Sequence, residues 1–350
     1  MASPEHPGAP TVLLHQDRPE HTPGLRLAVA SIRATCPDLP VRVSCPGASD
    51  ELMNWLAGAG VRADDDPRFA DLGWNVKPEL LLWALAEGCS RVLWIDADIV
   101  VMRRPERAIA QPPSVLVATE EFALGQEQGS QIRTQGWGLS PGRAYPHTVN
   151  TGVLMVSAQH RDVLERWAAM LQSDEYVAAQ GRPAIQRPLH MVSDQDVLTA
   201  LLGSAPFAHT DVHLLRRGLD IAQCAGPAGY TPQERLASLG RRSPALYHSV
   251  GVKPWEHGAD WRYGTTRRAR ARAGYEDLHL RLSPYTVVAH RFADAADVSL
   301  QALAPRNGVE RALLWLGRRW PQLPELPLAV FDISVRRLRQ LLRISRYARG

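Results

Sequence analysis

The sequence alternates short apolar segments with longer amphipathic ones, and this alternation constrains the fold more than any other feature. Apolar runs such as TVLLH at residues 11–15 and RVLWI at 91–95 have the length and composition of buried strands. Segments such as GLRLAVASIRATC at 24–36 and KPELLLWALAEGC at 77–89 are predicted helices. Strands that alternate with helices form βαβ units, so the sequence predicts an α/β fold in which helices flank a sheet.

Length and cysteine usage narrow the class of protein. A chain of 350 residues, of which 45% are hydrophobic, can bury one large core and carry smaller extensions. We expect a disordered N-terminus at residues 1–10, a catalytic domain at 11–290 and a helical basic appendage at 291–350. The four cysteines form no CxxC pair, which favours reduced thiols over a zinc ribbon or a disulfide scaffold: Cys36, Cys45, Cys89 and Cys224.

The N-terminal segment and the hydropathy pattern bear on localisation. The chain begins MASPEHPGAP, without the apolar stretch that follows the basic start of a secretory signal. No apolar run approaches the ~18 residues of a membrane-spanning helix. We therefore expect a cytoplasmic protein, either soluble or peripheral on the inner face of the membrane.

Positive charge is concentrated in the C-terminal segment. The whole chain has 40 basic and 36 acidic side chains and a net charge of +4, whereas residues 306–350 hold ten arginines against three acids, which gives +7. The rest of the chain therefore carries about −3 (4 − 7), and we expect no nucleic-acid partner because such a protein spreads basic charge over its fold.

The last segment, FDISVRRLRQLLRISRYARG at 331–350, is predicted to form a basic amphipathic helix, and NGVERALLWLGRRWP at 307–321 has similar character. One side of the last helix is apolar and the adjoining side is basic: Phe331, Val335, Leu338, Leu341 and Leu342, then Arg336, Arg339, Arg343 and Arg346. Three interpretations stay open. The helices bind an anionic membrane surface, pack on the catalytic domain, or pack on the second subunit of a homodimer.

Two acids, Asp96 and Asp98, follow the predicted strand RVLWI. In open α/β sheets ligands bind beyond the carboxyl ends of the strands, which is where these side chains stand. Carboxylates at i and i+2 converge on one point, and their hard oxygens suit Mg²⁺ or Mn²⁺. A buried strand rarely delivers two acids without a partner cation, so we predict a divalent metal site, with a solvated turn as the alternative.

A second polar motif is HSVGVKPW, which begins at His248. His248 is the candidate third metal ligand, Gly251 permits close approach of the backbone, and Lys253 can reach a phosphate. Only two of the 40 basic residues are lysines, Lys77 and Lys253, and a chain so rich in arginine keeps lysine where a compact charge is needed. The alternative is a strand-to-loop turn with a solvated lysine.

Further polar residues lie at the predicted ends of elements. Asn150 precedes the strand TGVLMVS, and SDQD places Asp194, Gln195 and Asp196 in the first turn of a helix. Each of them contacts a ligand or, alternatively, caps a loop or stabilises the helix dipole.

The long polar segment from 120 to 148 is a candidate acceptor lid, with Arg133 and Trp137 as contacts, and surface coil is the alternative.

In chain order, NVKPELLLWALAEGCSRVLWIDADIVV, VNTGVLMVS, SDQDVL and HSVGVKPW resemble glycosyltransferase family 8. This family contains glycogenin and bacterial lipopolysaccharide galactosyl- and glucosyltransferases, and the resemblance covers residues 11–256. It implies a GT-A fold, a Rossmann-like mixed sheet flanked by helices. It also implies retaining transfer of a hexose from a UDP-sugar to an acceptor hydroxyl.

The resemblance also implies residue roles. Asp96, Asp98 and His248 match the family's ligands to a divalent ion, Mn²⁺ or Mg²⁺, that bridges the two phosphates. Asp96 also matches a position that contacts the ribose. The matched positions near the nucleotide and its pyrophosphate are Lys77, Gly251 and Lys253.

Positions around the donor sugar are matched by Asn150, Asp194 and Gln195. An amide is a poor nucleophile, so we expect Gln195 to orient and polarise the donor rather than to bond covalently with it. Asp194 or Asp196 is expected to bind sugar hydroxyls.

Two other functions stay open. The triplet in DADIV also occurs in haloacid dehalogenase-like phosphatases, which use an aspartyl nucleophile and a lysine ahead of a further acidic motif. Here the only downstream lysine, Lys253, follows SDQD, so the order is wrong. A catalytically silent sugar-nucleotide-binding protein is the second alternative. The favoured function is a metal-dependent hexosyltransferase whose acceptor is a carbohydrate, a lipid-linked molecule or a small molecule.

Overall fold

The computed structural model describes residues 9–121, 129–227, 229–240, 243–256 and 267–347. The chain divides into two compact units, which we describe separately. Unit 1 consists of Met1–Leu25, Cys36–Ala97 and Pro105–Arg217, and unit 2 of Arg26–Thr35, Asp98–Arg104 and Gly218–Gly350. The boundary between unit 1 and unit 2 at Ala97 and Asp98 falls inside the Asp96–Ala97–Asp98 triplet.

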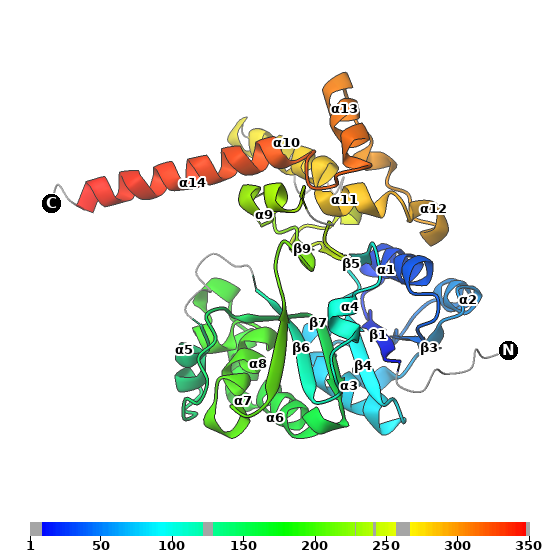
Figure 1. Ribbon diagram of the computed structural model, residues 1–350, viewed down its shortest axis with the longest axis vertical. Coiled ribbons are helices and arrows are strands. Elements are labelled where there is room, and N and C mark those ends of the chain that lie inside the picture. The colour runs from blue at the N-terminus through cyan, green and yellow to red at the C-terminus, as the bar shows by residue number, and fades with distance from the viewer. Residues whose placement is uncertain (1–8, 122–128, 228, 241–242, 257–266, 348–350) are drawn as a thin grey trace. The chain divides into compact units, whose positions relative to one another are not determined.

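Within the described residues, unit 1 is built on a seven-stranded sheet of order β3-β2-β1-β4-β7-β6-β8 (Figure 1). Its strands are β1 (Thr11–His15), β2 (Val41–Ser44), β3 (Arg62–Asp64), β4 (Arg91–Ile95), β6 (Val115–Glu120), β7 (Val149–Ser157) and β8 (Asp211–Leu215). Strands β3, β2, β1 and β4 are parallel, and β6 and β8 are parallel to each other. Strand β7 is antiparallel to both β4 and β6, so the predicted mixed sheet is confirmed.

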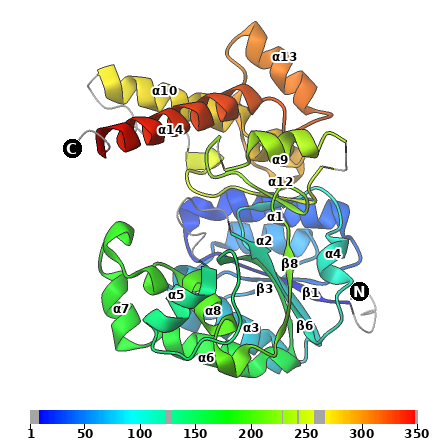
Figure 2. The same ribbon diagram turned by 60° about the vertical axis from the view of Figure 1, so that its left-hand side comes forward.

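Helices α3 (Lys77–Ala86), α6 (Arg161–Leu171) and α8 (Asp194–Leu202) pack side by side on one face of this sheet (Figure 2). Helix α6 is amphipathic, and its buried face includes Val163, Leu164 and Trp167. The other helices of unit 1 are α2 (Asp50–Gly58), α4 (Glu106–Ile109), α5 (Gly129–Gly136) and α7 (Asp174–Gln180). Helix α1 (Thr22–Thr35) begins in unit 1 and ends in unit 2.

Unit 2 has a three-stranded sheet of order β5-β10-β9 within its described residues. Its strands are β5 (Ile99–Val101), β9 (Ile221–Gln223) and β10 (Leu246–His248). Its helices are α9 (Pro232–Ala237), α10 (Arg267–Leu282), α11 (Pro284–Ala289), α12 (Ala293–Ala296), α13 (Gly308–Gly317) and α14 (Leu326–Tyr347). Tyr247 of β10 and Val100 of β5 are fully buried in one apolar core with Val288 of α11, so the small sheet and the helix share a core.

Most elements predicted from the sequence are present, and others are added. The predicted strands at 11–15 and 91–95 have the predicted bounds. The region from Arg216 to Ser243, which sequence patterns left unassigned, holds β9 and α9. The segment 218–290 belongs to the same compact unit as 291–350. The domain boundary expected at residue 290 stays a prediction. Residues 1–8 of the expected disordered N-terminus lie outside the described residues.

Two further features of the fold are the state of its cysteines and the character of its helices. The four cysteines are free thiols. In the described part of the chain, no helix combines the length and the apolar character needed to cross a membrane. Both predicted C-terminal helices are present as α13 and α14.

Candidate functional site

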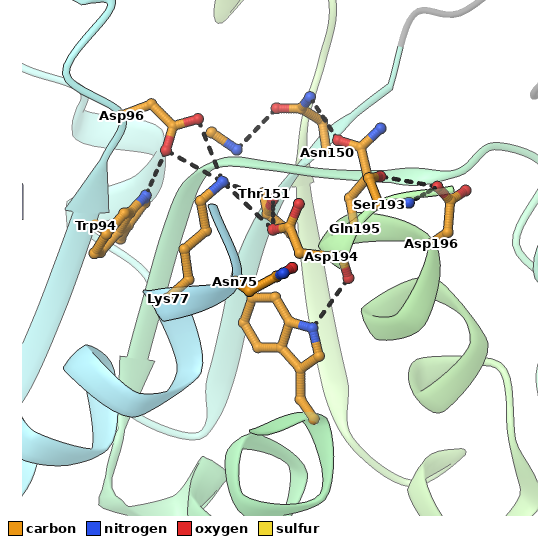
Figure 3. A network of polar contacts seen from close by, with 12 residues as sticks. Asn75, Lys77, Trp94, Asp96, Asn150, Thr151, Ser193, Asp194, Gln195 and Asp196 are labelled. Atoms are coloured by element: carbon orange, nitrogen blue, oxygen red, sulfur yellow. Dashed lines mark hydrogen bonds and ion pairs between the residues drawn. The ribbon is translucent and has the colours of Figure 1, made fainter. Parts of the chain in front are cut away.

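Strand topology gathers polar residues at one edge of the unit 1 sheet. Because β7 is antiparallel to β4, its first residues lie beside the carboxyl end of β4, and the Asp96 N–H donates to the Gly152 carbonyl at 2.8 Å. Asn150 pairs with Thr119 near the carboxyl end of β6. Helices α3 and α8 begin at the same edge, with Lys77 and Asp194 as their first residues (Figure 3). Sites in open α/β sheets form at such edges.

Lys77 lies at the centre of this edge and is buried, with 4% of its surface exposed (Figure 3). Its ammonium nitrogen donates to Thr151 Oγ1 at 3.0 Å and pairs with Asp96 Oδ1 at 3.2 Å and Asp194 Oδ2 at 3.4 Å. Trp94 Nε1 donates to the same Asp96 oxygen at 2.7 Å. Asp96 is therefore held from two sides, while 24% of its side chain stays exposed.

Asp194 is bound on both its side chain and its main chain. The Thr151 hydroxyl donates to Asp194 Oδ2 at 2.7 Å, and Trp167 Nε1 donates to the Asp194 carbonyl at 3.0 Å. Burial raises the pKa of Asp194, although Lys77 and the Thr151 hydrogen bond oppose that rise. Lys77 and Thr151 offset only part of the cost of burying the Asp194 carboxyl group. This group can therefore exchange its present hydrogen bonds for hydrogen bonds to a ligand with several hydroxyl groups.

Asn150 connects the strand edge to helix α8. Its amide nitrogen donates to Glu121 Oε2 at 2.7 Å and to Gln195 Oε1 at 3.1 Å, and its amide oxygen accepts from the Gly152 N–H at 2.9 Å. Asn150 and Glu121 are buried, whereas Gln195 is partly exposed. Among the described residues, Gln195 is thus held through its side-chain oxygen only.

Asp196 has a different environment from its neighbours on α8. It is fully buried, and Arg133 Nε donates to its Oδ1 at 2.7 Å. The main-chain N–H and the hydroxyl of Ser193 donate to its Oδ2 at 3.1 and 2.8 Å. These contacts favour a structural role for Asp196 over the donor contact expected from the sequence.

The segment 120–148 is not a continuous coil, because it contains helix α5. Arg133 on this helix is fully buried against Asp196, so the expected acceptor contact by Arg133 is wrong. The indole of Trp137 donates to the His190 carbonyl at 2.9 Å. Residues 122–128 of the predicted lid lie outside the described residues.

In unit 2 a second polar group consists of Asp98, His248 and Lys253. Strands β5 and β10 pair with His248 opposite Ile99, which brings His248 Nε2 to 3.2 Å from Asp98 Oδ1. The Lys253 ammonium forms a close ion pair with Asp98 Oδ2 and also donates to the Ser249 carbonyl. Burial alone would raise the pKa of Asp98, but Lys253 and His248 outweigh it and hold the pKa well below its usual range.

This second group has unused coordinating capacity. Among the described residues, Asp98 Oδ1 and His248 Nδ1 are buried without a hydrogen-bond partner. Buried polar atoms are nearly always hydrogen-bonded, so such atoms indicate a ligand, a metal or a catalytic role. The His248 nitrogen beside Asp98 Oδ1 is Nε2, at 3.2 Å. An anionic oxygen beside an imidazole nitrogen is a donor pair that suits Mn²⁺ or Zn²⁺, and the oxygen also suits Mg²⁺.

Gly251 lies between His248 and Lys253 and has φ of +90°, and no atom of the described residues outside its chain neighbours lies within 4 Å of the place where a Cβ would stand. The position therefore needs glycine for its left-handed backbone rather than for close packing. The turn at Gly251 returns the chain so that Lys253 reaches Asp98.

The sequence missed three residues of the unit 1 cluster, which are Trp94, Thr151 and Glu121. Side chains two apart on a strand share a face, so Trp94 could have been placed beside Asp96. The position of Thr151 in the cluster could not have been predicted, because adjacent side chains on a regular strand point to opposite faces, which would direct Thr151 away from Asn150. The ladder between β6 and β7 is irregular here, since Val117 pairs with Met155 but Thr119 pairs with Asn150. Such bulges redirect side chains.

No protein-family profile and no curated protein matches this sequence. In structure, the chain is similar to the apo form of the bifunctional glycosyltransferase WbbM, with a TM-score of 0.53 and 12% identity over 83% of this chain. The chain covers 53% of the length of WbbM. It is also similar to the galactosyltransferase LgtC in complex with donor and acceptor sugar analogues, with a TM-score of 0.47, 19% identity, and coverage of 86% of this chain and 99% of LgtC. Mouse xyloside xylosyltransferase 1 gives a TM-score of 0.42, 14% identity, and coverage of 69% and 97%.

The similarity to WbbM, together with the seven-stranded mixed sheet flanked by helices, shows that this chain has the GT-A glycosyltransferase fold predicted from its sequence. A fold of this kind supports many chemistries, so the function has to be argued from the site.

Proposed function

We propose that this protein is a retaining glycosyltransferase that moves a hexose from a UDP-sugar to an acceptor hydroxyl, with a divalent cation on the diphosphate. The observation that carries the proposal is the Asp98–His248–Lys253 group, which combines a cation-binding pair with a lysine. The GT-A fold and the family 8 motifs support the same function.

In this proposal Asp96, Asp98 and His248 would hold the cation, as the family 8 motifs imply. The residues present fit such an ion, because Asp98 Oδ1 is an anionic oxygen without a hydrogen-bond partner among the described residues. When bound, a divalent cation supplies Lewis-acid stabilisation of negative charge on phosphate oxygens. Trp94 and Lys77 fix the orientation of Asp96 before any ligand binds.

Lys253 is proposed to bind the departing phosphate. A lysine ammonium has three N–H donors, and two of them contact Asp98 and the Ser249 carbonyl. The described part of the chain offers no further acceptor to it, so one N–H is available for a phosphate oxygen. A positive charge at that oxygen is worth more in the transition state, where the bond to the sugar breaks and negative charge builds.

Asp194 and Gln195 are proposed to bind the donor sugar, with Asn150 in support. The bond between the anomeric carbon and the phosphate oxygen breaks while the acceptor oxygen bonds to the same face of the sugar. The departing phosphate takes the acceptor proton, so no protein nucleophile is required and the configuration is retained. The Lys77 ammonium lies between Asp96 and Asp194 and pairs with the Asp194 carboxylate (Figure 3).

The C-terminal helices are proposed to bind an anionic membrane surface on the cytoplasmic side. Large apolar side chains are exposed on α13 and α14, including Trp315 at 70%, Phe331 at 59% and Leu338 at 57%. The segment that carries them has a net charge of +7 from its sequence. An exposed apolar face with arginines is the combination that binds lipid headgroups and acyl chains. A lipid-linked acceptor would be reached at such a surface.

The alternatives differ in how well the fold accommodates them. The GT-A fold disfavours a haloacid dehalogenase-like phosphatase, whose catalysis needs a lysine after its nucleophile and before a second acidic motif. A catalytically silent sugar-nucleotide-binding protein would have the same fold as the transferase. The two differ in that only the transferase turns the sugar nucleotide over.

The proposed function is tested with a panel of nucleotide sugars and Mn²⁺, read by release of UDP and by the thermal shift of the protein. We expect one UDP-sugar to be hydrolysed or transferred, and chelation of the metal to abolish both UDP release and the thermal shift. Phosphate release from phosphomonoesters would support the phosphatase instead. Binding of UDP-sugars without any UDP release would support the silent binding protein.

A further inference from the structure

Asn150 fixes which atom of Gln195 faces a ligand. The Gly152 main-chain N–H can only donate, so the Asn150 side-chain atom 2.9 Å from it is the carbonyl oxygen. The Asn150 amide nitrogen is therefore the atom that faces Glu121 and Gln195. The orientation of this amide follows from hydrogen-bond chemistry alone.

The orientation of the Asn150 amide also fixes the orientation of the Gln195 amide. The Asn150 NH₂ group can only donate, and it lies 2.7 Å from the Glu121 carboxylate and 3.1 Å from Gln195. Gln195 must therefore present its carbonyl oxygen to Asn150. Its own NH₂ group points away, and within the described part of the chain it has no hydrogen-bond partner (Figure 3).

We infer that Gln195 donates an amide N–H to an oxygen of the bound donor, and that Glu121 is the positioning residue that enforces this polarity through Asn150. The ligand atom is an acceptor, such as a sugar hydroxyl or a glycosyl phosphate oxygen. The Gln195 carbonyl oxygen, which a nucleophilic or proton-accepting role would require, accepts a hydrogen bond from Asn150 and is held toward it. The identity of the ligand rests on the proposed function, whereas the polarity of the chain of hydrogen bonds does not.

Burial explains why Glu121 can enforce the orientation. Glu121 and Asn150 are 8% and 6% exposed, so water competes little for their hydrogen bonds. A rotated Asn150 amide would place its oxygen against both the Glu121 carboxylate and the Gln195 carbonyl, and its nitrogen against the Gly152 N–H. Leaving several buried groups unpaired in this way is strongly disfavoured.

The direction of the Glu121–Asn150–Gln195 hydrogen bonds can be tested without any substrate, by exchanging the donor and the acceptor between Asn150 and Glu121. Asn150→Asp places an acceptor against Glu121, and we expect the Tm to fall by about 4 °C or more because buried hydrogen bonds are lost. Adding Glu121→Gln to Asn150→Asp supplies a donor to the new carboxylate and is expected to recover at least half of that fall. Glu121→Gln alone still offers an oxygen to Asn150 and is the matched control. A double variant whose Tm loss equals or exceeds the sum of the two single losses would overturn the assigned polarity.

The role of the amide is tested with Gln195→Glu, which keeps an oxygen for Asn150 and replaces the outward N–H with a second oxygen. We expect a Tm close to that of the wild type, an affinity for the UDP-sugar reduced about 10–100-fold, and affinity for UDP with Mn²⁺ unchanged. An unchanged affinity for the UDP-sugar would overturn the donor role while leaving the proposed function standing.

Glu121→Met separates positioning from simple structural support. It removes the oxygen that orients Asn150, and we expect the donor KM to rise severalfold while Glu121→Gln largely restores it. If Glu121→Met lowers the Tm without changing the donor KM, the positioning role is wrong. A wild-type protein that binds neither UDP nor any UDP-sugar would instead reject the proposed function, and the Tm comparison would still decide the polarity.

Discussion

Glu325 and Asp98 are two carboxylates of unit 2, and each contacts a histidine and a longer basic side chain, but their oxygens are used differently. Glu325 is fully buried, with one oxygen 2.6 Å from Arg235 Nη2 and the other bonded to His279 Nδ1. Arg235 in turn donates to the main-chain oxygens of Tyr230 and Gln322. Within the described residues, Asp98 Oδ1 has no hydrogen-bond partner, although His248 lies 3.2 Å away.

Electrostatics does not separate the two groups. Burial would raise the pKa of each carboxyl, and in each the neighbouring histidine and basic side chain outweigh burial and lower the pKa. The difference is in hydrogen-bond saturation. A saturated buried ion pair is part of the scaffold, whereas an unsaturated one retains the capacity to bind a ligand. The following predictions test this distinction.

Replacement of Asp98 is expected to have the largest effect. Asp98→Asn keeps the shape of the side chain but removes the anionic oxygen proposed to bind the cation. We expect UDP release with Mn²⁺ to fall on the order of 10³-fold or more, because charge stabilisation in the transition state is lost. Circular dichroism and the Tm would show that the fold is retained.

The matched control for Asp98 is Asp277, a buried carboxylate of α10 that pairs with Arg281 and Arg306. Asp277→Asn should lower the Tm and leave kcat/KM of the folded enzyme unchanged. If Asp98→Asn retains activity near that of the wild type, the metal assignment is wrong.

Disruption of the saturated pair should affect stability rather than activity. Arg235→Met breaks a fully buried ion pair and leaves the Glu325 carboxylate with its hydrogen bond to His279. We expect the free energy of unfolding to fall by about 3–5 kcal/mol, with kcat/KM unchanged in the protein that stays folded. Urea unfolding followed by tryptophan fluorescence measures the loss. A loss below about 1 kcal/mol would mean that this pair is as weak as an exposed ion pair.

The low pKa of Glu325 predicts a smaller effect that depends on pH. A carboxyl whose pKa is lower in the folded state stabilises the fold above its ordinary pKa of 4.5, and that stability is lost as the pH falls through the folded-state pKa. The variant Glu325→Gln cannot titrate, so its unfolding free energy should change less than that of the wild type as the pH falls below 4.5. Urea unfolding between neutral and acid pH compares the two slopes, and equal slopes would contradict the prediction.

The sequence predicted the frame of the fold because hydrophobic periodicity is local. Strand β4 and the acids that follow it are visible in RVLWIDAD, and the edge of an open sheet is a general place for a site. The contact of Asp196 with Arg133 was not visible in SDQD. Arg133 lies 63 residues away in the chain and pairs with Asp196 only when α5 packs on α8.

The hydrogen-bond partners within the site could not be predicted from local sequence patterns either, because the partners are distant in the chain. Thr151 joins Lys77 to Asp194 and lies where the β6–β7 ladder is irregular, and no residue type in VNTGVLMVS signals that irregularity. Glu121 gives no sequence signal either, since an acid after a strand is common on protein surfaces. Its contact is with the amide of Asn150, which donates to the Glu121 carboxylate at 2.7 Å from 29 residues away in the chain. The sequence therefore predicted which types of polar residue lie at the site, but not which residues they form hydrogen bonds with.

The smallest expected effect on stability concerns the exposed apolar residues of α14, which contrast with both buried groups. The double replacement Phe331→Ser and Leu338→Ser removes apolar area that is already exposed, so we expect the free energy of unfolding to change by about 0.5 kcal/mol or less. Binding to anionic vesicles should nevertheless weaken severalfold, because those side chains would insert beneath the headgroups. Vesicle co-sedimentation at low and high salt measures this, with neutral vesicles as the control. Unchanged sedimentation of the variant would favour packing against protein, and a change in its oligomeric state would identify a second subunit as the partner.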